Sequence, residues 1–369
     1  MSEMKPGRSF VSAQQVAELA GVSRSAVSRT FTDGASVSET TRKKVLEAAE
    51  QLGYHVNHLA RSLIHEDSGI VCLIGADLNT PYHSRLLDAI TRRLQAINRV
   101  AMVINTSGDS DSAEAALRQT LNYRANATVV LSGTPPASLI NTCINSGQHV
   151  ILINRDDHLD GPESITVDNT VAAREAFHML HRAGCRRIAV VSSQAGTPSL
   201  VARERGFEQA AQEAGLAVSI TRAGPTGYGA GFEAGRLLLS GSDRPDAAFC
   251  VTDLLACGFM DAARVEFGMN VPADLCVVGF DDIEQASWAS YQLTTFRQPI
   301  AQIAEHITTL LDSDNSAVHN GPGVHNGSAV HNGPDVINGP DVVSGSGGVS
   351  GSRICFHAAP VWRRTVRPK

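Results

Sequence analysis

The sequence SAQQVAELAGVSRSAVSR, residues 12–29, decides the fold of the first part of the chain. Ser12, followed three residues later by Gln15, forms a capping box that places the start of a helix at Ser12. Gly21 then permits a tight turn, and Ser23 can cap a second helix. Apolar residues recur at helical spacing on both sides of this turn, at Val16, Leu19, Ala20, Ala26, Val27 and Phe31. The stretch therefore predicts a helix-turn-helix.

A third helix is expected from about Ser38 to Gly53, so that three short helices bury one small core. The start of the second helix is predicted to read DNA, because arginine donates bidentately to guanine in the major groove. We expect contacts from Ser12, Ser23, Arg24, Ser25, Ser28 and Arg29. Cations that could bind phosphates are Arg42, Lys43, Lys44 and Arg61. The alternative is a small helical bundle with a solvated, charged face.

The longer remainder of the chain alternates continuous apolar runs with helical patterns, which is typical of parallel sheets covered on both faces. This repetition predicts two doubly wound α/β lobes. The apolar runs lie at 70–74, 100–104, 128–131, 150–153, 187–191, 247–251 and 275–280.

Residues 315–352 interrupt this pattern with a repeated hexad, V-x-N-G-x-x. Asn-Gly followed by proline favours turns, so we interpret the stretch as a flexible insertion; a parallel β-helix would need more copies and a cap. Strand-like sequence resumes at 353–356. The expected domains are a headpiece (1–56), a linker (57–67), a two-lobed core (68–314 and 353–363), the insertion and a tail (364–369).

Composition excludes several classes of protein. The net charge of −6 confines DNA binding to a local surface. The seven cysteines form no C-x-x-C pair, and no metal site or cofactor is expected. The N-terminus is too polar for a secretory signal and no apolar run could span a membrane, so we expect a cytoplasmic, nucleoid-associated protein. Enzyme motifs such as GxGxxG, a Walker loop or GxSxG are missing, and the glycine-rich run 227–231 follows no clear strand.

The first 64 residues resemble the lactose-repressor/galactose-repressor (LacI/GalR) family of bacterial regulators. The matching motifs are Val16-Ala17, Ala20-Gly21-Val22-Ser23, Val27-Ser28-Arg29, Val37-Ser38-x-x-Thr41-Arg42-x-x-Val45, Leu52-Gly53-Tyr54 and Asn57-x-x-Ala60-Arg61-Ser62-Leu63. The resemblance implies a hinge helix that orders on DNA, with contacts from Asn57, His58, Ala60, Arg61 and Leu63. Leu63 would wedge into the minor groove; the alternative is an ordinary linker leucine.

The resemblance continues through the core, for example at Val167-Asp168-Asn169, Arg203-x-x-Gly206-Phe207 and Val277-Val278-Gly279-Phe280-Asp281-Asp282. It implies the two-lobed fold of periplasmic sugar-binding proteins (type I), whose ligands sit at the carboxyl ends of strands, between the lobes. The candidate effector-binding residues are Asn79, Tyr82, His83, Asn154, Arg155, Arg203, Arg222, Asp253 and Trp288.

Several of these residues have structural alternatives. Asp253 could cap a helix, Arg203 could pair with a glutamate, and His83 and Arg222 could face solvent. Asp281 and Asp282 are expected to hold a crossover between the lobes rather than to touch the ligand.

Together these features predict a transcriptional regulator, a repressor that binds a near-palindromic operator in double-stranded DNA as a homodimer. A sugar-like effector would shift the angle between the lobes. If His83, Arg155, Arg203 and Arg222 all faced the ligand, it would be anionic, a sugar acid or a sugar phosphate. The alternatives are a sugar-binding protein without a role on DNA, and an enzyme.

Overall fold

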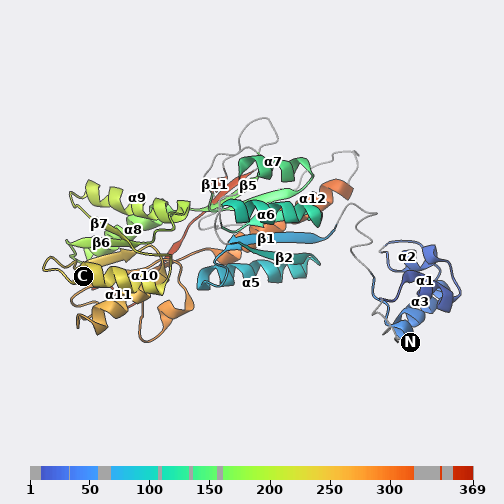
Figure 1. The fold of residues 1–369 in the computed structure, drawn as a ribbon, viewed down its shortest axis with the longest axis horizontal. Coiled ribbons are helices and arrows are strands. Elements are labelled where there is room, and N and C mark those ends of the chain that lie inside the picture. The colour runs from blue at the N-terminus through green and yellow to red at the C-terminus, as the bar shows by residue number, and fades with distance from the viewer. Residues whose placement is uncertain are drawn as a thin grey trace, which may run out of the picture. The chain divides into compact units, whose positions relative to one another are not determined.

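The computed structural model describes residues 10–32, 34–56, 68–106, 110–132, 136–155, 161–319, 341–342 and 352–368 (Figure 1). Its contacts divide the chain between Ser68 and Gly69 into two units, which we call the headpiece and the core. No helix in the described part of the chain is both long and apolar enough to cross a membrane.

The described residues of the headpiece form three helices, α1 (Ala13–Ala20), α2 (Arg24–Thr30) and α3 (Glu39–Leu52). The predicted starts are confirmed, because the hydroxyls of Ser12, Ser23 and Ser38 cap the three helices. The helices bury Val16, Ala17, Val27, Val45, Ala48 and Ala49. Leu19 and Leu46, which share the helical periodicity, are exposed instead.

The N-terminal lobe of the core is built on a sheet with the strand order β11-β12-β5-β4-β3-β1-β2. Its strands are parallel except β11, which pairs antiparallel with β12. The strands are β1 (Ile70–Ala76), β2 (Val100–Thr106), β3 (Ala127–Val130), β4 (His149–Ile153), β5 (Glu163–Val167), β11 (Asp341–Val342) and β12 (Arg353–Phe356). The sheet packs against the helices α5 (Pro81–Ala96), α12 (Ile300–His319), α6 (Ser110–Asn122) and α7 (Ala137–Asn145). Both faces of this sheet are therefore covered, as predicted.

The C-terminal lobe holds a parallel sheet of four strands in the order β7-β6-β8-β9. Its strands are β6 (Ile188–Ser192), β7 (Ser219–Arg222), β8 (Ala247–Cys250) and β9 (Cys276–Val278). Its helices are α8 (Asn169–Arg182), α9 (Pro198–Glu213), α10 (Tyr228–Leu239), α11 (Asp253–Val265) and the 3-10 turn η1 (Glu284–Ser287). One core cluster joins them around Phe177, Phe207 and Phe249.

The chain crosses between the lobes after β5, after β10 (Thr295–Arg297) and between β12 and β13 (Ala359–Val361). The strands β10 and β13 pair with each other in antiparallel fashion at these crossovers (Figure 1). The two-lobed α/β architecture is thus confirmed, with doubly wound parallel sheets as its basis.

The boundaries near the C-terminus differ from our expectation. Helix α12 ends at His319, inside the segment that we assigned to the insertion, and β11 also lies in that segment. Residues 320–340 and 343–351 lie outside the described residues. The expected tail, 364–368, is instead part of the C-terminal lobe, because Thr365 and Val366 are buried there.

The hydroxyl of Thr365 links this last segment to β9 and to the residue that precedes β10. It donates to the Val277 carbonyl oxygen at 2.6 Å and accepts the Thr294 backbone N–H at 2.8 Å.

Thr365→Val should lower the free energy of unfolding by about 1–3 kcal/mol, because it leaves the buried Thr294 N–H without an acceptor. Urea unfolding measures this change. Thr142→Val, which removes an exposed hydroxyl from α7, is the control. If Thr365→Val has the same free energy of unfolding as wild type, the Thr365 hydrogen bonds do not stabilise the core.

Candidate DNA-binding face and effector site

The predicted DNA-reading residues lie along one exposed face of α2. Ser23, Arg24, Ser25, Ser28 and Arg29 are all exposed, while Val27 and Thr30 face the headpiece core. Arg29 Nε donates to the Ser25 carbonyl oxygen at 3.4 Å, and the Ser23 and Ser25 hydroxyls lie 2.9 Å apart. The side chains are therefore available to a duplex without unfolding any part of the headpiece.

Two other residues expected to contact DNA, Ser12 and Arg42, make hydrogen bonds within the headpiece. The Ser12 hydroxyl serves the capping box, since it accepts the Gln15 backbone N–H at 3.4 Å and donates to Gln15 Oε1 at 3.1 Å. Arg42 Nη1 donates to the Thr30 carbonyl oxygen at 3.0 Å, so this side chain caps the C-terminal end of α2. The predicted hinge residues lie outside the described residues: Asn57, His58, Ala60, Arg61 and Leu63.

In the core, Arg203 on α9 is the centre of a buried polar group, although an arginine in a helix would ordinarily be solvated. Its Nε donates to Asn169 Oδ1 at 2.8 Å, and its Nη1 donates to the Val251 carbonyl oxygen at 2.7 Å. The guanidinium lies 3.5 Å from the centroid of the Phe280 ring. Burial lowers its pKa. The second terminal nitrogen, Nη2, makes no hydrogen bond to the described residues.

Asp281 faces this arginine from the loop after β9. Its Oδ1 lies 3.6 Å from Arg203 Nη1 and accepts Gln298 Nε2 at 2.6 Å. Burial raises the pKa of Asp281 to about 6. The backbone φ of Asp281 is 122°, a conformation that an L-residue adopts only when its surroundings enforce it.

Tyr82, on α5 of the other lobe, completes the group. Its hydroxyl oxygen is buried and has no hydrogen-bond partner of normal geometry among the described residues. Burial and the nearby Asp281 raise its pKa, while Arg203 and Asn154 act in the opposite direction. Three further buried oxygens have no hydrogen-bond partner among the described residues: Ser192 Oγ at the end of β6, Gln298 Oε1, and Gln285 Oε1 in η1. Unpaired buried polar atoms are rare in native proteins.

The remaining N-terminal-lobe candidates surround this group with varied roles. Asn154 Oδ1 accepts the Val167 backbone N–H at 3.1 Å, so its amide partly serves the end of β5. His83 Nδ1 lies 3.0 Å from Thr80 Oγ1, and burial lowers the His83 pKa. Arg155 is buried, which lowers its pKa, whereas Asn79 is exposed in the loop before α5.

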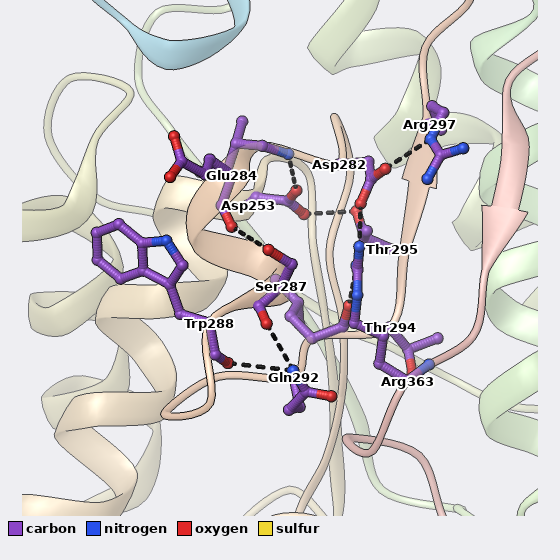
Figure 2. Close-up of polar contacts among 12 residues, drawn as sticks. Asp253, Asp282, Glu284, Ser287, Trp288, Gln292, Thr294, Thr295, Arg297 and Arg363 are labelled. Atoms are coloured by element: carbon purple, nitrogen blue, oxygen red, sulfur yellow. Dashed lines mark hydrogen bonds and ion pairs between the residues drawn. The ribbon is translucent and has the colours of Figure 1, made fainter.

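Three other sequence-predicted effector residues, Asp253, Arg222 and Trp288, lie in different surroundings. Asp253 is completely buried and accepts hydrogen bonds on both carboxylate oxygens, from Thr295 Oγ1 at 2.5 Å and from the Ile283 N–H at 2.9 Å. Arg222 forms an ion pair with the buried Glu204 carboxylate. The two hydrogen bonds of Asp253 tie α11 to β10 and to the loop after β9. Trp288 is 48% exposed, and Figure 2 shows its indole directed away from Thr294, Thr295 and Arg363.

Asp282 holds the crossovers, as the sequence led us to expect. Its carboxylate accepts Arg297 Nε at 2.7 Å and Arg363 Nη2 at 2.6 Å (Figure 2). Arg85, one turn along α5 from Tyr82, donates from Nη1 to the Asp282 carbonyl oxygen at 2.6 Å. Burial acts to raise the pKa of Asp282, but the two arginine hydrogen bonds lower it overall.

Among the described residues, no three His, Cys, Asp or Glu side chains come together as a metal site.

Residues 13–57 match the family model of bacterial regulatory proteins of the lacI family, and residues 177–328 match the periplasmic binding protein-like domain. The chain is 30% identical over 304 residues to catabolite control protein A of Priestia megaterium, covering 82% of this chain and 91% of that relative. The chain belongs to the LacI family.

Other relatives agree with this assignment. The LacI-family chain is 30% identical over 303 residues to the HTH-type transcriptional regulator GalS of Salmonella typhimurium, covering 82% of this chain and 89% of GalS. A crystal structure of the Lac repressor dimer bound to operator and the anti-inducer ONPF shares its fold, with a TM-score of 0.79 at 22% identity over 97% of this chain and 99% of that chain. The relatives are transcriptional regulators, which confirms a regulator rather than an enzyme.

The buried Asp253 predicts a distinctive pH dependence of stability. Burial, reinforced by Asp281, raises its pKa to about 8 from an ordinary value of 3.8. The folded state therefore keeps a proton that the unfolded chain has lost, and Asp253 lowers the stability as the pH rises from about 4 to 8. Its largest contribution to the slope is about 1.4 kcal/mol per pH unit.

Asp253→Asn should remove this contribution, so the difference in unfolding free energy between variant and wild type should change in favour of the variant from pH 5 to pH 7. Urea unfolding at both values measures it. A difference that is independent of pH would mean that Asp253 is ionised in the folded protein.

Proposed function

We propose that this regulator is a repressor that binds a near-palindromic operator as a homodimer and responds to a sugar-like effector in the core. The exposed row of Arg24, Ser25, Ser28 and Arg29 on α2 is the observation that carries the DNA-binding half. A helix start with exposed arginines and hydroxyls fits the major groove, where such groups reach base edges. A sugar-binding protein without a role on DNA would have no use for this face.

The effector site is proposed to lie among Tyr82, Arg203, Asp281 and Gln298. Its free hydrogen-bonding groups are one guanidinium nitrogen and several uncharged oxygens, a set suited to sugar hydroxyls. The resulting charge balance differs from the one that led us to expect an anion. Arg222 is paired with Glu204, Arg203 faces Asp281, and burial favours neutral His83. We therefore favour a neutral sugar over a sugar acid or a sugar phosphate.

The neighbouring Asp281 and Asp282 suggest how binding would alter the lobes. Asp281 faces the proposed effector, while Asp282 holds the strands at two crossovers through Arg297 and Arg363. An effector that displaced Asp281 would also move these anchors and the Arg85 contact from α5. The change in lobe angle would then reach the linker, and the coupling would equal the difference in effector affinity between the two states, typically about 1–3 kcal/mol.

Arg24→Ala tests the DNA-binding face. On a duplex recovered by selection from random sequences, the variant should lose about 1–3 kcal/mol of discrimination at one guanine position, because a bidentate contact is removed. Fluorescence anisotropy on single-base variants of that duplex measures the loss. Lys44→Ala on α3 is the control and should weaken all duplexes alike, with a smaller dependence on salt. If Arg24→Ala matches wild type on every duplex, Arg24 does not read DNA.

Tyr82→Phe tests the effector site with little effect on the fold, because it removes a buried hydroxyl that has no hydrogen-bond partner of normal geometry among the described residues. A thermal-shift screen of neutral sugars, sugar acids and sugar phosphates should first yield a neutral ligand. The variant should keep the wild-type melting temperature and bind that ligand about 5- to 100-fold more weakly, the effect of losing one buried hydrogen bond. Titration calorimetry measures the affinity. Unchanged affinity would place the ligand elsewhere, and a hit confined to acids or phosphates would contradict the neutral effector.

A further inference from the structure

Two buried cysteines, Cys185 and Cys276, lie together at the opposite end of the C-terminal sheet from the effector site. Cys185 stands in the turn between α8 and β6, and Cys276 is the first residue of β9. The effector site lies beyond the carboxyl ends of these parallel strands, whereas both cysteines lie at the amino ends. The proposed effector therefore does not involve this pair.

Arg367 contacts both sulfur atoms. Its Nη2 donates to Cys185 Sγ at 3.1 Å, and its backbone N–H donates to Cys276 Sγ at 3.4 Å. Its Nη1 is held by the carbonyl oxygens of Pro272 and Ala273 at 3.1 and 2.9 Å. A guanidinium fixed in this way favours the thiolate form of a neighbouring cysteine. Arg367 is partly exposed, so the pair lies just beneath a residue at the surface.

The pair differs from the other buried cysteines. Burial raises the pKa of Cys72 and Cys257 to about 12, and also raises the pKa of Cys143 and Cys250. The neighbouring Cys185 thiol and the Arg367 N–H lower the pKa of Cys276 to about 7, and the protonated Cys276 Sγ can donate to the Pro272 carbonyl oxygen at 3.8 Å. The neighbouring Cys276 raises the pKa of Cys185, which keeps its proton. One thiolate beside one thiol is the arrangement from which disulfides form.

We propose that Cys185 and Cys276 form a peroxide-sensitive dithiol site that closes to an intramolecular disulfide. The Cys276 thiolate attacks one oxygen of hydrogen peroxide, the O–O bond breaks, and hydroxide leaves and takes up a proton as water. The sulfenic acid on Cys276 is then attacked by the Cys185 sulfur, and the S–O bond breaks with loss of a second water. Two thiols are oxidised and one peroxide is reduced to two waters.

The disulfide would join the turn before β6 to the start of β9 across the intervening strand β8. It would also take from Arg367 the sulfur acceptors that anchor the last segment of the chain. The site would thus make the C-terminal lobe responsive to oxidants independently of the effector.

The experiment exposes the reduced full-length chain to hydrogen peroxide, alkylates the remaining thiols and maps the disulfides by mass spectrometry. We expect a product without covalent links between chains that is lighter by about 2 Da. It should contain one disulfide, Cys185–Cys276, which dithiothreitol reduces. Arg367→Met should slow its formation several-fold, because the variant loses the guanidinium beside the thiols. Cys257→Ser, which removes a buried thiol outside the pair, is the matched control and should react like wild type.

Mapping on the wild-type chain keeps the test independent of whether a cysteine variant folds. Peroxide treatment that leaves both thiols alkylatable, or that links other cysteines first, would overturn the proposal. If Arg367→Met forms the disulfide at the wild-type rate, the guanidinium does not activate these thiols, and the pair has no reason to react before the other cysteines.

Discussion

The core depends on a small set of buried polar side chains whose hydrogen-bond and ion-pair partners come from other parts of the chain. Arg203, Asp253, Asp281 and Asp282 are each almost inaccessible to solvent, and a buried polar or charged group without a partner would be costly. Each finds its partners on a different segment of the chain, so these groups are satisfied only when α9, α11, the loop after β9 and the crossover strands are all in place. This requirement fixes the lobes and creates the polar site at once.

The loop after β9 is the clearest example of that double role. Gly279 leaves room for Asp253, since a Cβ there would lie 2.2 Å from Asp253 Oδ1. Asp281 and Asp282 both adopt positive φ, which turns neighbouring carboxylates toward different partners. One carboxylate meets Arg203 and Gln298 beside the proposed effector, and the other meets the arginines of the crossovers. Strain of this kind persists only where the surrounding contacts enforce it.

Local patterns predicted the helices of the headpiece well, because a capping serine and a following glycine act within one turn of chain. The buried strands β1, β3, β4, β6 and β8 were also recognisable as continuous apolar runs. Strands β5 (Glu163–Val167), β7 (Ser219–Arg222) and β10 (Thr295–Arg297) were missed, since β5 and β7 are only partly buried and β10 is very short. The C-terminal segment looked like a tail because its single buried hydroxyl, on Thr365, finds partners about 70 to 90 residues away in sequence.

The effector site shows a similar limit. The sequence identified Tyr82 and Arg203 through family resemblance, but pairing decides which cations remain free, and Arg222 finds Glu204 only in the folded lobe. Gln298 and Ser192 carried no signal in the sequence; their unpaired oxygens are visible only once burial is known.

In the proposed function, occupancy of the core by a sugar controls the affinity of the headpiece for DNA. The most direct test is the affinity of the full-length chain for a selected duplex, measured with and without the sugar found by thermal shift. We expect this affinity to change by about 5- to 150-fold at fixed salt. An affinity that stays the same while the sugar saturates the core would contradict it.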